Sequence, residues 1–176
     1  MGWYESSYRK LFFDFHSPRE AIGLASAFDA ERWAERLDKA HAQAVSVFIM
    51  GARGWSFYRK GSYRHVHPYL PEGLDMVEQQ LASLHKRGIK GIGYHATLPS
   101  EALADEHPEW REVDAKGQRS NTGMCMLSPV FEQWLLPHVA EVVSLYELDG
   151  MFFDGTFARG QCFCPYCQDR FASFSG

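Results

Sequence analysis

Mainly apolar runs alternate along this chain with amphipathic stretches. The runs are short and bounded by Gly, Asp or His, which is typical of buried strands. Between them, apolar positions recur at helical spacing. We predict strands at 11–15, 45–50, 89–94 and 151–154, with helices at 30–40, 74–87 and 130–146 between them. Strands that alternate with helices predict right-handed crossovers and a parallel sheet, and hence the α/β class.

The loops of this pattern differ in length according to the element they follow. Loops after strands are long and rich in polar and aromatic residues, including the stretch 99–127 with a turn at 114–117, whereas loops after helices are short. A (β/α)8 barrel has this asymmetry, but it takes about 250 residues, and only about four β/α units fit here. We therefore predict one domain, residues 1–176, that forms the first half of a TIM barrel: about four parallel strands with outer helices, open sheet edges and no catalysis by the chain alone.

Composition and charge narrow the class of protein. The net charge of −4 and the isoelectric point near 6.0 argue against nucleic acid as a partner. No apolar run approaches the roughly 20 residues of a membrane span, and the N-terminus has no apolar signal-peptide region. We therefore expect a cytoplasmic protein with no membrane partner. The aromatic content of 15% is compatible with a carbohydrate-stacking cleft, although most aromatic residues belong to cores.

The fourth predicted strand ends on a carboxylate, Asp154. Catalytic side chains of α/β barrels project from the carboxyl ends of the strands, so Asp154 is the candidate catalytic residue. The alternative is a structural aspartate that caps the next turn.

Four cysteines form the second candidate site. Cys162, Cys164 and Cys167 lie within six residues, and Cys125 is the remaining cysteine. In a reducing compartment such a cluster favours metal over disulfides, and four thiolates make a closed tetrahedral zinc site with Zn–S distances of about 2.3 Å. We expect a structural zinc ion that joins the loop after the fourth strand to the 99–127 stretch, with the sulfurs within about 4 Å of one another. Buried free cysteines are the alternative.

Three stretches carry a family resemblance: 48–58 with its Gly-Trp-Ser-Phe-Tyr, 91–117 around His-Pro-Glu-Trp, and 149–155 followed by Cys-x-Cys-x-x-Cys. Together they resemble the N-terminal half of an α-L-fucosidase-like glycoside hydrolase barrel, including its hypothetical glycosyl hydrolase relatives, which often carry a β-galactosidase-type trimerisation domain. The resemblance implies a carbohydrate substrate, a retaining exo-glycosidase with Asp154 as nucleophile, and a homo-oligomer for the full-length form. A lone cysteine upstream of Cys-x-Cys-x-x-Cys resembles the structural zinc site of the related β-galactosidases.

The resemblance also implies that histidines at the ends of the first two strands bind sugar hydroxyls. His16 fits the first position. At the second, the His-His pair typical of the family is replaced by Ala52 and Arg53. A permanent cation there puts fucose specificity in question. Arg53 could instead meet a substrate carboxylate, or pair with Asp14 or Asp154.

Two further residues are candidate substrate contacts. Trp55 is a candidate stacking platform, with ordinary loop packing as the alternative. His95, after the third strand, is a candidate ligand or a structural histidine. The carboxyl ends of parallel strands gather at one end of a barrel, which is the mouth of its active site. We expect Trp55 and His95 to point into this mouth together with His16 and Asp154.

Two other functions stay open at this point. In a β-galactosidase-like hydrolase, the carboxylate after the fourth strand would be the acid/base instead of the nucleophile. In a non-catalytic or truncated carbohydrate-binding barrel fragment, it would have no catalytic role. A retaining mechanism needs two carboxyl groups, and the second is expected from a later strand or loop.

Overall fold

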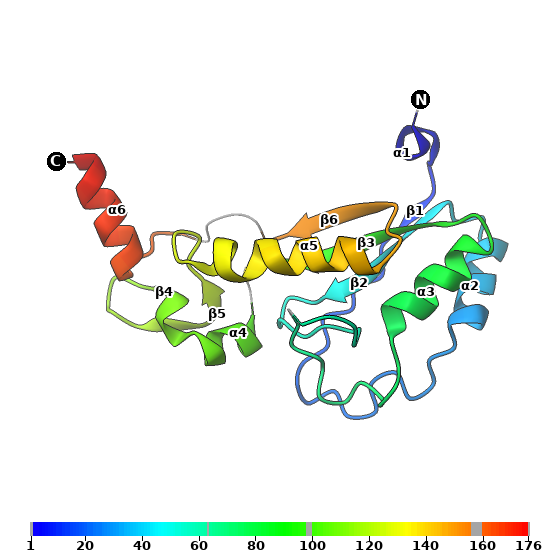
Figure 1. Cartoon of the computed structure of the whole chain (residues 1–176), viewed down its shortest axis with the longest axis horizontal. Coiled ribbons are helices and arrows are strands. Elements are labelled where there is room, and N and C mark those ends of the chain that lie inside the picture. Colours follow the sequence, from blue (N-terminus) through cyan, green and yellow to red (C-terminus); the bar gives the residue numbers. More distant parts are fainter. Residues whose placement is uncertain (1, 63, 98–99, 156–159, 176) are drawn as a thin grey trace.

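A parallel four-stranded sheet forms the centre of the computed structural model, which describes residues 2–62, 64–97, 100–155 and 160–175 (Figure 1). Its strands lie in the order β1-β2-β3-β6, with every neighbouring pair parallel. The predicted α/β class and the predicted parallel sheet are therefore confirmed. The strands are β1 (Lys10–Leu11), β2 (Ala44–Met50), β3 (Lys90–Ala96) and β6 (Gly150–Asp154).

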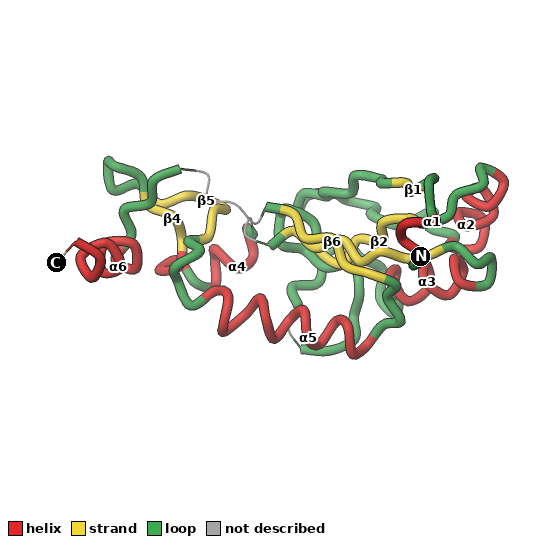
Figure 2. The backbone as a smooth tube through the Cα atoms, turned by 90° about the horizontal axis from the view of Figure 1, so that it is seen from above, coloured by secondary structure: helices red, strands yellow, loops and turns green. Residues whose placement is uncertain are grey.

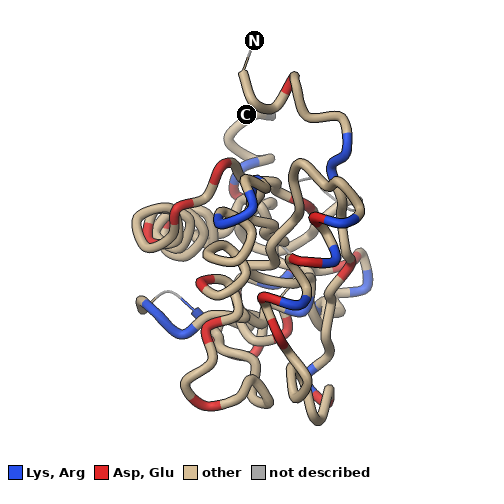
Figure 3. The backbone as a smooth tube through the Cα atoms, turned by 90° about the vertical axis from the view of Figure 1, so that its right-hand side faces the viewer, with Lys and Arg blue, Asp and Glu red and all other residues tan. Residues whose placement is uncertain are grey.

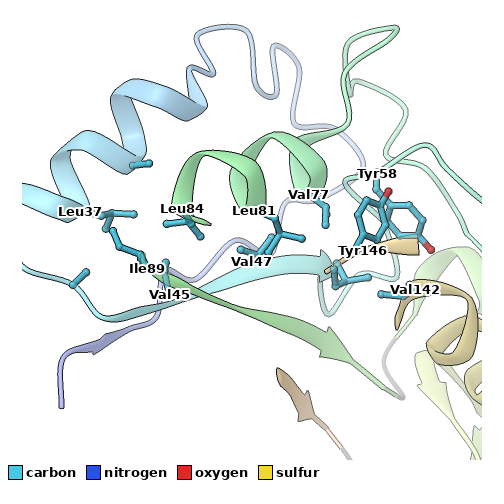
Figure 4. Close-up of a cluster of buried hydrophobic side chains, with 13 residues drawn as sticks. Leu37, Val45, Val47, Tyr58, Val77, Leu81, Leu84, Ile89, Val142 and Tyr146 are labelled. Carbon is cyan, nitrogen blue, oxygen red and sulfur yellow. The ribbon is translucent and has the colours of Figure 1, made fainter. Parts of the chain in front are cut away.

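Helices cover one face of this sheet. Alternate residues of β2, namely Val45, Val47 and Ile49, point to this face and pack against apolar side chains of the helices (Figure 4). This burial of a continuous apolar run is what the sequence pattern predicts for a strand of a parallel sheet. The helices that supply the partners are α2 (Ala30–Lys39), α3 (Met76–His85) and α5 (Leu136–Leu145).

Aromatic residues occupy the opposite face. Phe48 and Tyr94 are neighbours in the β2–β3 register and stack with ring centroids 4.1 Å apart. Phe152 of β6 stacks on Tyr94, and Phe12 packs against the same rings. Phe12 and Phe152 remain about half exposed. In a closed barrel this face is the packed interior.

The ends of the helices follow local signals. Asp29 caps α2 by accepting a hydrogen bond from Arg32 N (2.9 Å). Asp75 does the same for α3 through Glu78 N (2.9 Å), so α3 begins two residues later than expected. The third predicted helix begins instead as a π-helical turn, Phe131–Leu135. Pro137, which has no N–H to donate, is the second residue after that turn.

The predicted first strand is shorter than expected. Only Lys10 and Leu11 pair with β2, and the chain then leaves the sheet. Phe15 packs on Phe57 (ring centroids 4.7 Å apart), and Phe13 and Phe15 line an apolar cavity of about 520 Å³ together with residues of α2 and α3. From Phe12 onwards, the apolar pattern of 11–15 therefore serves packing and not strand pairing.

The 99–127 stretch contains structure that the sequence pattern left unassigned, although Pro99 itself lies outside the described residues. The predicted turn is confirmed: Asp114 Oδ1 accepts hydrogen bonds from two following backbone N–H groups, and Gly117 has φ +79°. Figure 2 shows this stretch at the end of the molecule where α6 also lies. The stretch contains α4 (Glu101–Glu106), a 3-10 turn (Pro108–Trp110) and the antiparallel strands β4 (Arg111–Val113) and β5 (Arg119–Met124). Two further helices lie outside it: α1 (Trp3–Ser6) and α6 (Pro165–Ser175).

The surface combines both signs of charge. In the view of Figure 3, basic and acidic residues are mixed along the chain, in keeping with the small net charge. Among the described residues, no helix is long and apolar enough to cross a membrane.

The aromatic sheet face generates a prediction about association. Because Phe12 and Phe152 leave apolar surface exposed beside the sheet edges, the 176-residue chain should self-associate with rising concentration. Phe152→Thr should weaken the association, measured as mass by light scattering after gel filtration. Tyr8→Thr, which removes an aromatic ring that is 87% exposed, is the control. A wild-type chain that stays monomeric at all concentrations would contradict this prediction.

Candidate active site and cysteine centre

Asp154 lies at the carboxyl end of β6 with its carboxylate exposed. Its Oδ2 accepts a hydrogen bond from the hydroxyl of Tyr94 (2.7 Å), and its Oδ1 accepts one from Gly155 N (2.7 Å). Each oxygen is therefore held by one donor from the protein. The arrangement leaves an oriented carboxylate that is open to a ligand.

Tyr94 is the residue that fixes this orientation. Burial raises the pKa of its hydroxyl above the ordinary value, and the hydrogen bond to Asp154 and the charges of Asp154 and Asp14 raise it further. The hydroxyl therefore stays protonated and donates to Asp154. Tyr94 was not among the predicted site residues.

His16 lies beside this pair, as predicted. Its Nδ1 accepts a hydrogen bond from Ala52 N (2.8 Å). Its Nε2 lies 3.1 Å from Asp14 Oδ1 and 3.4 Å from the Tyr94 hydroxyl oxygen. One connected set of polar side chains thus runs from the segment after β1, through β3, to the end of β6. It consists of Asp14, His16, Tyr94 and Asp154.

His95 does not point to this mouth, contrary to expectation. Its side chain is fully buried on the helical face, where its Nε2 lies 3.0 Å from His138 Nδ1. The Tyr58 hydroxyl lies 2.6 Å from His138 Nε2, which completes a buried network of three side chains. Because Tyr94 and His95 are successive strand residues, they must point to opposite faces. This alternation, which the sequence already contained, could have selected Tyr94 over His95.

Arg53 and Trp55 lie on the loop after β2. Arg53 Nη1 pairs with Glu101 Oε1 of α4 (2.7 Å), so the predicted pairing with Asp14 or Asp154 is wrong. Glu101 N also donates to Arg53 O (2.9 Å), which fixes this loop to α4.

The ring of Trp55 lies near Arg19, whose guanidinium is 5.8 Å from the ring centroid, and near His67. Neither of these contacts links Trp55 to Asp154. Of the four residues expected at one mouth, the structure joins His16 and Asp154, through Tyr94.

The four cysteines converge, as the sequence predicted. Their sulfurs all lie within 4.8 Å of one another, slightly wider than the expected 4 Å, and Cys125 and Cys167 are 3.4 Å apart. Cys125 follows β5, whereas the other three lie just before and inside the first turn of α6. The cluster thus joins the β4–β5 hairpin to α6.

The surroundings of these sulfurs suit a cation. Val113 N donates to Cys162 Sγ and Leu127 N donates to Cys125 Sγ, both over 3.4 Å. Burial raises the pKa of Cys125 and raises that of Cys167 to about 11, so these two sulfurs are thiols at neutral pH unless a cation binds them. Four converging sulfurs are a donor set that fits tetrahedral zinc.

Parallel strands with helices on one face and a carboxylate at a strand end define a segment of an α/β barrel of the kind that carries catalytic groups on its loops. The chain belongs to the hypothetical glycosyl hydrolase 6 family, whose model matches residues 29–155, more than half of its length. No curated protein matches the chain.

Solved structures with the same fold include glycosidases. An alpha-L-fucosidase isoenzyme 2 from Paenibacillus thiaminolyticus is 24% identical with a TM-score of 0.84, over 96% of this chain and 26% of that one. A beta-galactosidase from Rahnella sp. R3 is 19% identical with a TM-score of 0.63, over 93% of this chain and 24% of that one. The chain therefore spans about a quarter of the length of these enzymes.

A third structure is of a size closer to this chain. A hypothetical protein from Ruminiclostridium thermocellum is 15% identical with a TM-score of 0.58, over 94% of this chain and 89% of that one. At these identities the three likenesses establish the fold alone.

The buried histidines generate a prediction about pH. Burial lowers the pKa of His95 to about 4, and burial with the neighbouring His95 and His65 lowers that of His138 to about 2. The unfolded chain takes up protons below about pH 6.5, while the folded chain keeps both rings neutral. Stability should therefore fall as the pH falls from about 6.5 towards 4, by about 2 kcal/mol per histidine at pH 5.

Urea unfolding at pH 7.5 and pH 5 measures this loss. His95→Asn should flatten the pH dependence, whereas His41→Asn, at an exposed position with φ +55° that asparagine tolerates, should leave it unchanged. An equal pH dependence in all three proteins would show that the buried pair is not its source.

Proposed function

We propose that this chain supplies the nucleophile of a retaining exo-glycosidase of α-L-fucosidase-like type, and that Asp154 is that nucleophile. The observation that carries the proposal is the exposed Asp154 carboxylate at a strand end, oriented by Tyr94 and Gly155 N. Membership of a glycosyl hydrolase family supports it. Carbohydrate is the proposed substrate class.

The hydrogen bonds favour a nucleophile over an acid. Donors aimed at both oxygens of a carboxylate stabilise its charged form, which a nucleophile needs and a proton donor does not. The expected cation, Arg53, is engaged by Glu101 instead, so Tyr94 is the residue that supports the charge. A retaining mechanism also needs a second carboxyl group about 5–5.5 Å away. We expect that group from later parts of the barrel, and no hydrolysis by the 176-residue chain alone.

A β-galactosidase-like hydrolase is the second candidate. The likeness to the Rahnella enzyme over 93% of this chain favours it. Asp154 would then be the acid/base, and the reaction would still retain the anomeric configuration.

Replacing Asp154 tests whether it takes part in catalysis at all. In the polypeptide of the complete reading frame, Asp154→Asn should lower kcat by several orders of magnitude with little change in stability, because the side chain is exposed. Hydrolysis of aryl glycosides measures the loss, and Asp38→Asn, an exposed aspartate on α2, is the control. Full activity in Asp154→Asn would remove this residue from the mechanism.

Azide rescue of Asp154→Gly then assigns the role. If Asp154 is the nucleophile, azide attacks the substrate directly and gives a glycosyl azide of inverted configuration. If it is the acid/base, azide attacks the glycosyl-enzyme and the configuration is retained. Nuclear magnetic resonance of the product distinguishes the two.

We also propose a structural zinc ion held by Cys125, Cys162, Cys164 and Cys167. Zinc would hold the four sulfurs as thiolates and link the β4–β5 hairpin to α6. The convergence of the sulfurs within 4.8 Å and the N–H donors of Val113 and Leu127 support this proposal.

Metal analysis tests the zinc site. We expect about one zinc ion per chain, lost in Cys125→Ser, and a lower melting temperature after chelation that added Zn²⁺ restores. Added Mg²⁺ is the control and should not restore the melting temperature, because magnesium prefers oxygen ligands. A cysteine outside the cluster would be the matched control variant, but the chain has no fifth cysteine. Wild-type protein that binds no zinc under reducing conditions would leave the cluster as four free thiols.

A further inference from the structure

Both ring nitrogens of His16 are occupied within the protein. Nδ1 accepts a hydrogen bond from Ala52 N, so in the neutral ring Nε2 carries the hydrogen. Nε2 lies 3.1 Å from Asp14 Oδ1, an ion-pair distance, and 3.4 Å from the Tyr94 oxygen. Tyr94 gives its own hydrogen to Asp154 and can accept from His16. His16 therefore has no ring nitrogen left for a sugar hydroxyl.

Asp14 has the capacity that His16 lacks. Its side chain is 67% exposed, against 29% for His16. Its only hydrogen-bond or ion-pair partner among the described residues is His16, through Oδ1, and a carboxylate has about four acceptor positions. The charge of Asp14 helps to raise the pKa of the Tyr94 hydroxyl, so the Asp14 carboxylate lies near the group that holds Asp154.

The other polar groups near this mouth are engaged. The cation of Arg53 is paired with Glu101, and Ala52 offers a methyl group and a backbone N–H that His16 already occupies. Two carboxylates, Asp14 and Asp154, therefore dominate the charge of the mouth in the described part of the chain. Such a mouth repels an anionic sugar and accepts hydrogen bonds from hydroxyls.

We propose that Asp14 is the residue that binds substrate hydroxyls in this site, and that it selects a neutral sugar over an acidic one. His16 is then a positioning residue that holds the Asp14 carboxylate beside Tyr94. This inference rests on the proposed function, because it concerns the same mouth. It replaces the expectation that Arg53 meets a substrate carboxylate.

Sugar binding to the polypeptide of the complete reading frame tests the inference. The probes are L-fucose and D-galactose as neutral sugars and D-galacturonic acid as an acidic one, each titrated by nuclear magnetic resonance. Asp14→Asn should weaken binding of the preferred neutral sugar by about 10- to 100-fold, the effect of losing a charged acceptor. It should also lower the ratio of the dissociation constant of D-galacturonic acid to that of the preferred neutral sugar. Asp38→Asn, which removes the same charge from an exposed site on α2, should change neither quantity.

The ring state of His16 gives a readout that does not depend on activity. Nitrogen chemical shifts should show hydrogen on Nε2 in the wild type. Equal sugar binding by wild type and Asp14→Asn would overturn the inference, as would a loss confined to His16→Gln. Absence of binding of both neutral sugars by the wild type would overturn it too. The azide experiment on Asp154 judges the proposed function separately, because it follows an aryl glycoside and not a free sugar.

Discussion

The alternation of side chains along β3 decides which face of the sheet each of two polar side chains, Tyr94 and His95, serves. Tyr94 points to the aromatic face and holds Asp154, whereas His95 points to the helical face and joins His138. A shift of one residue in this strand would exchange the two, removing the support of the carboxylate and placing a tyrosine in the helical layer. The β2 register, which stacks Phe48 on Tyr94, opposes that shift.

The loops beyond the strand ends are fixed to one another as well as to the sheet, since Phe57 N donates to Ile49 O of β2. Arg53 and Glu101 join the loop after β2 to α4, and Ser100 N donates to Thr122 O of β5. The close approach of Gly54 to Ser100 is part of the same contact: a Cβ on Gly54 would lie 2.9 Å from the Ser100 Cα, and φ at Gly54 is +81°. The cysteine cluster continues this chain of contacts from the hairpin to α6.

The sequence predicts the parallel sheet well, because buried runs and helical spacing are local signals that agree with the fold. The same reasoning predicts Asp154 at a strand end and the convergence of the cysteines. It fails for the 11–15 run, where an apolar pattern is equally suited to a cavity wall, and for the partner of Arg53. Whether Arg53 pairs with Asp14, Asp154 or Glu101 depends on the position of α4. No spacing in the sequence encodes the distance between Arg53 and that helix.

His16 and Arg53 were both expected to contact substrate, and both are engaged within the protein for the same physical reason. A family pattern assigns a role to a residue type at a position, but a side chain can serve a ligand only with hydrogen-bonding capacity that the protein has not used. His16 uses both nitrogens, on Ala52 N and on Asp14, and Arg53 uses Nη1 on Glu101. Asp14 and Asp154 are carboxylates with unused acceptor positions and exposed oxygens. The chemistry that this mouth offers a ligand is therefore that of two carboxylates.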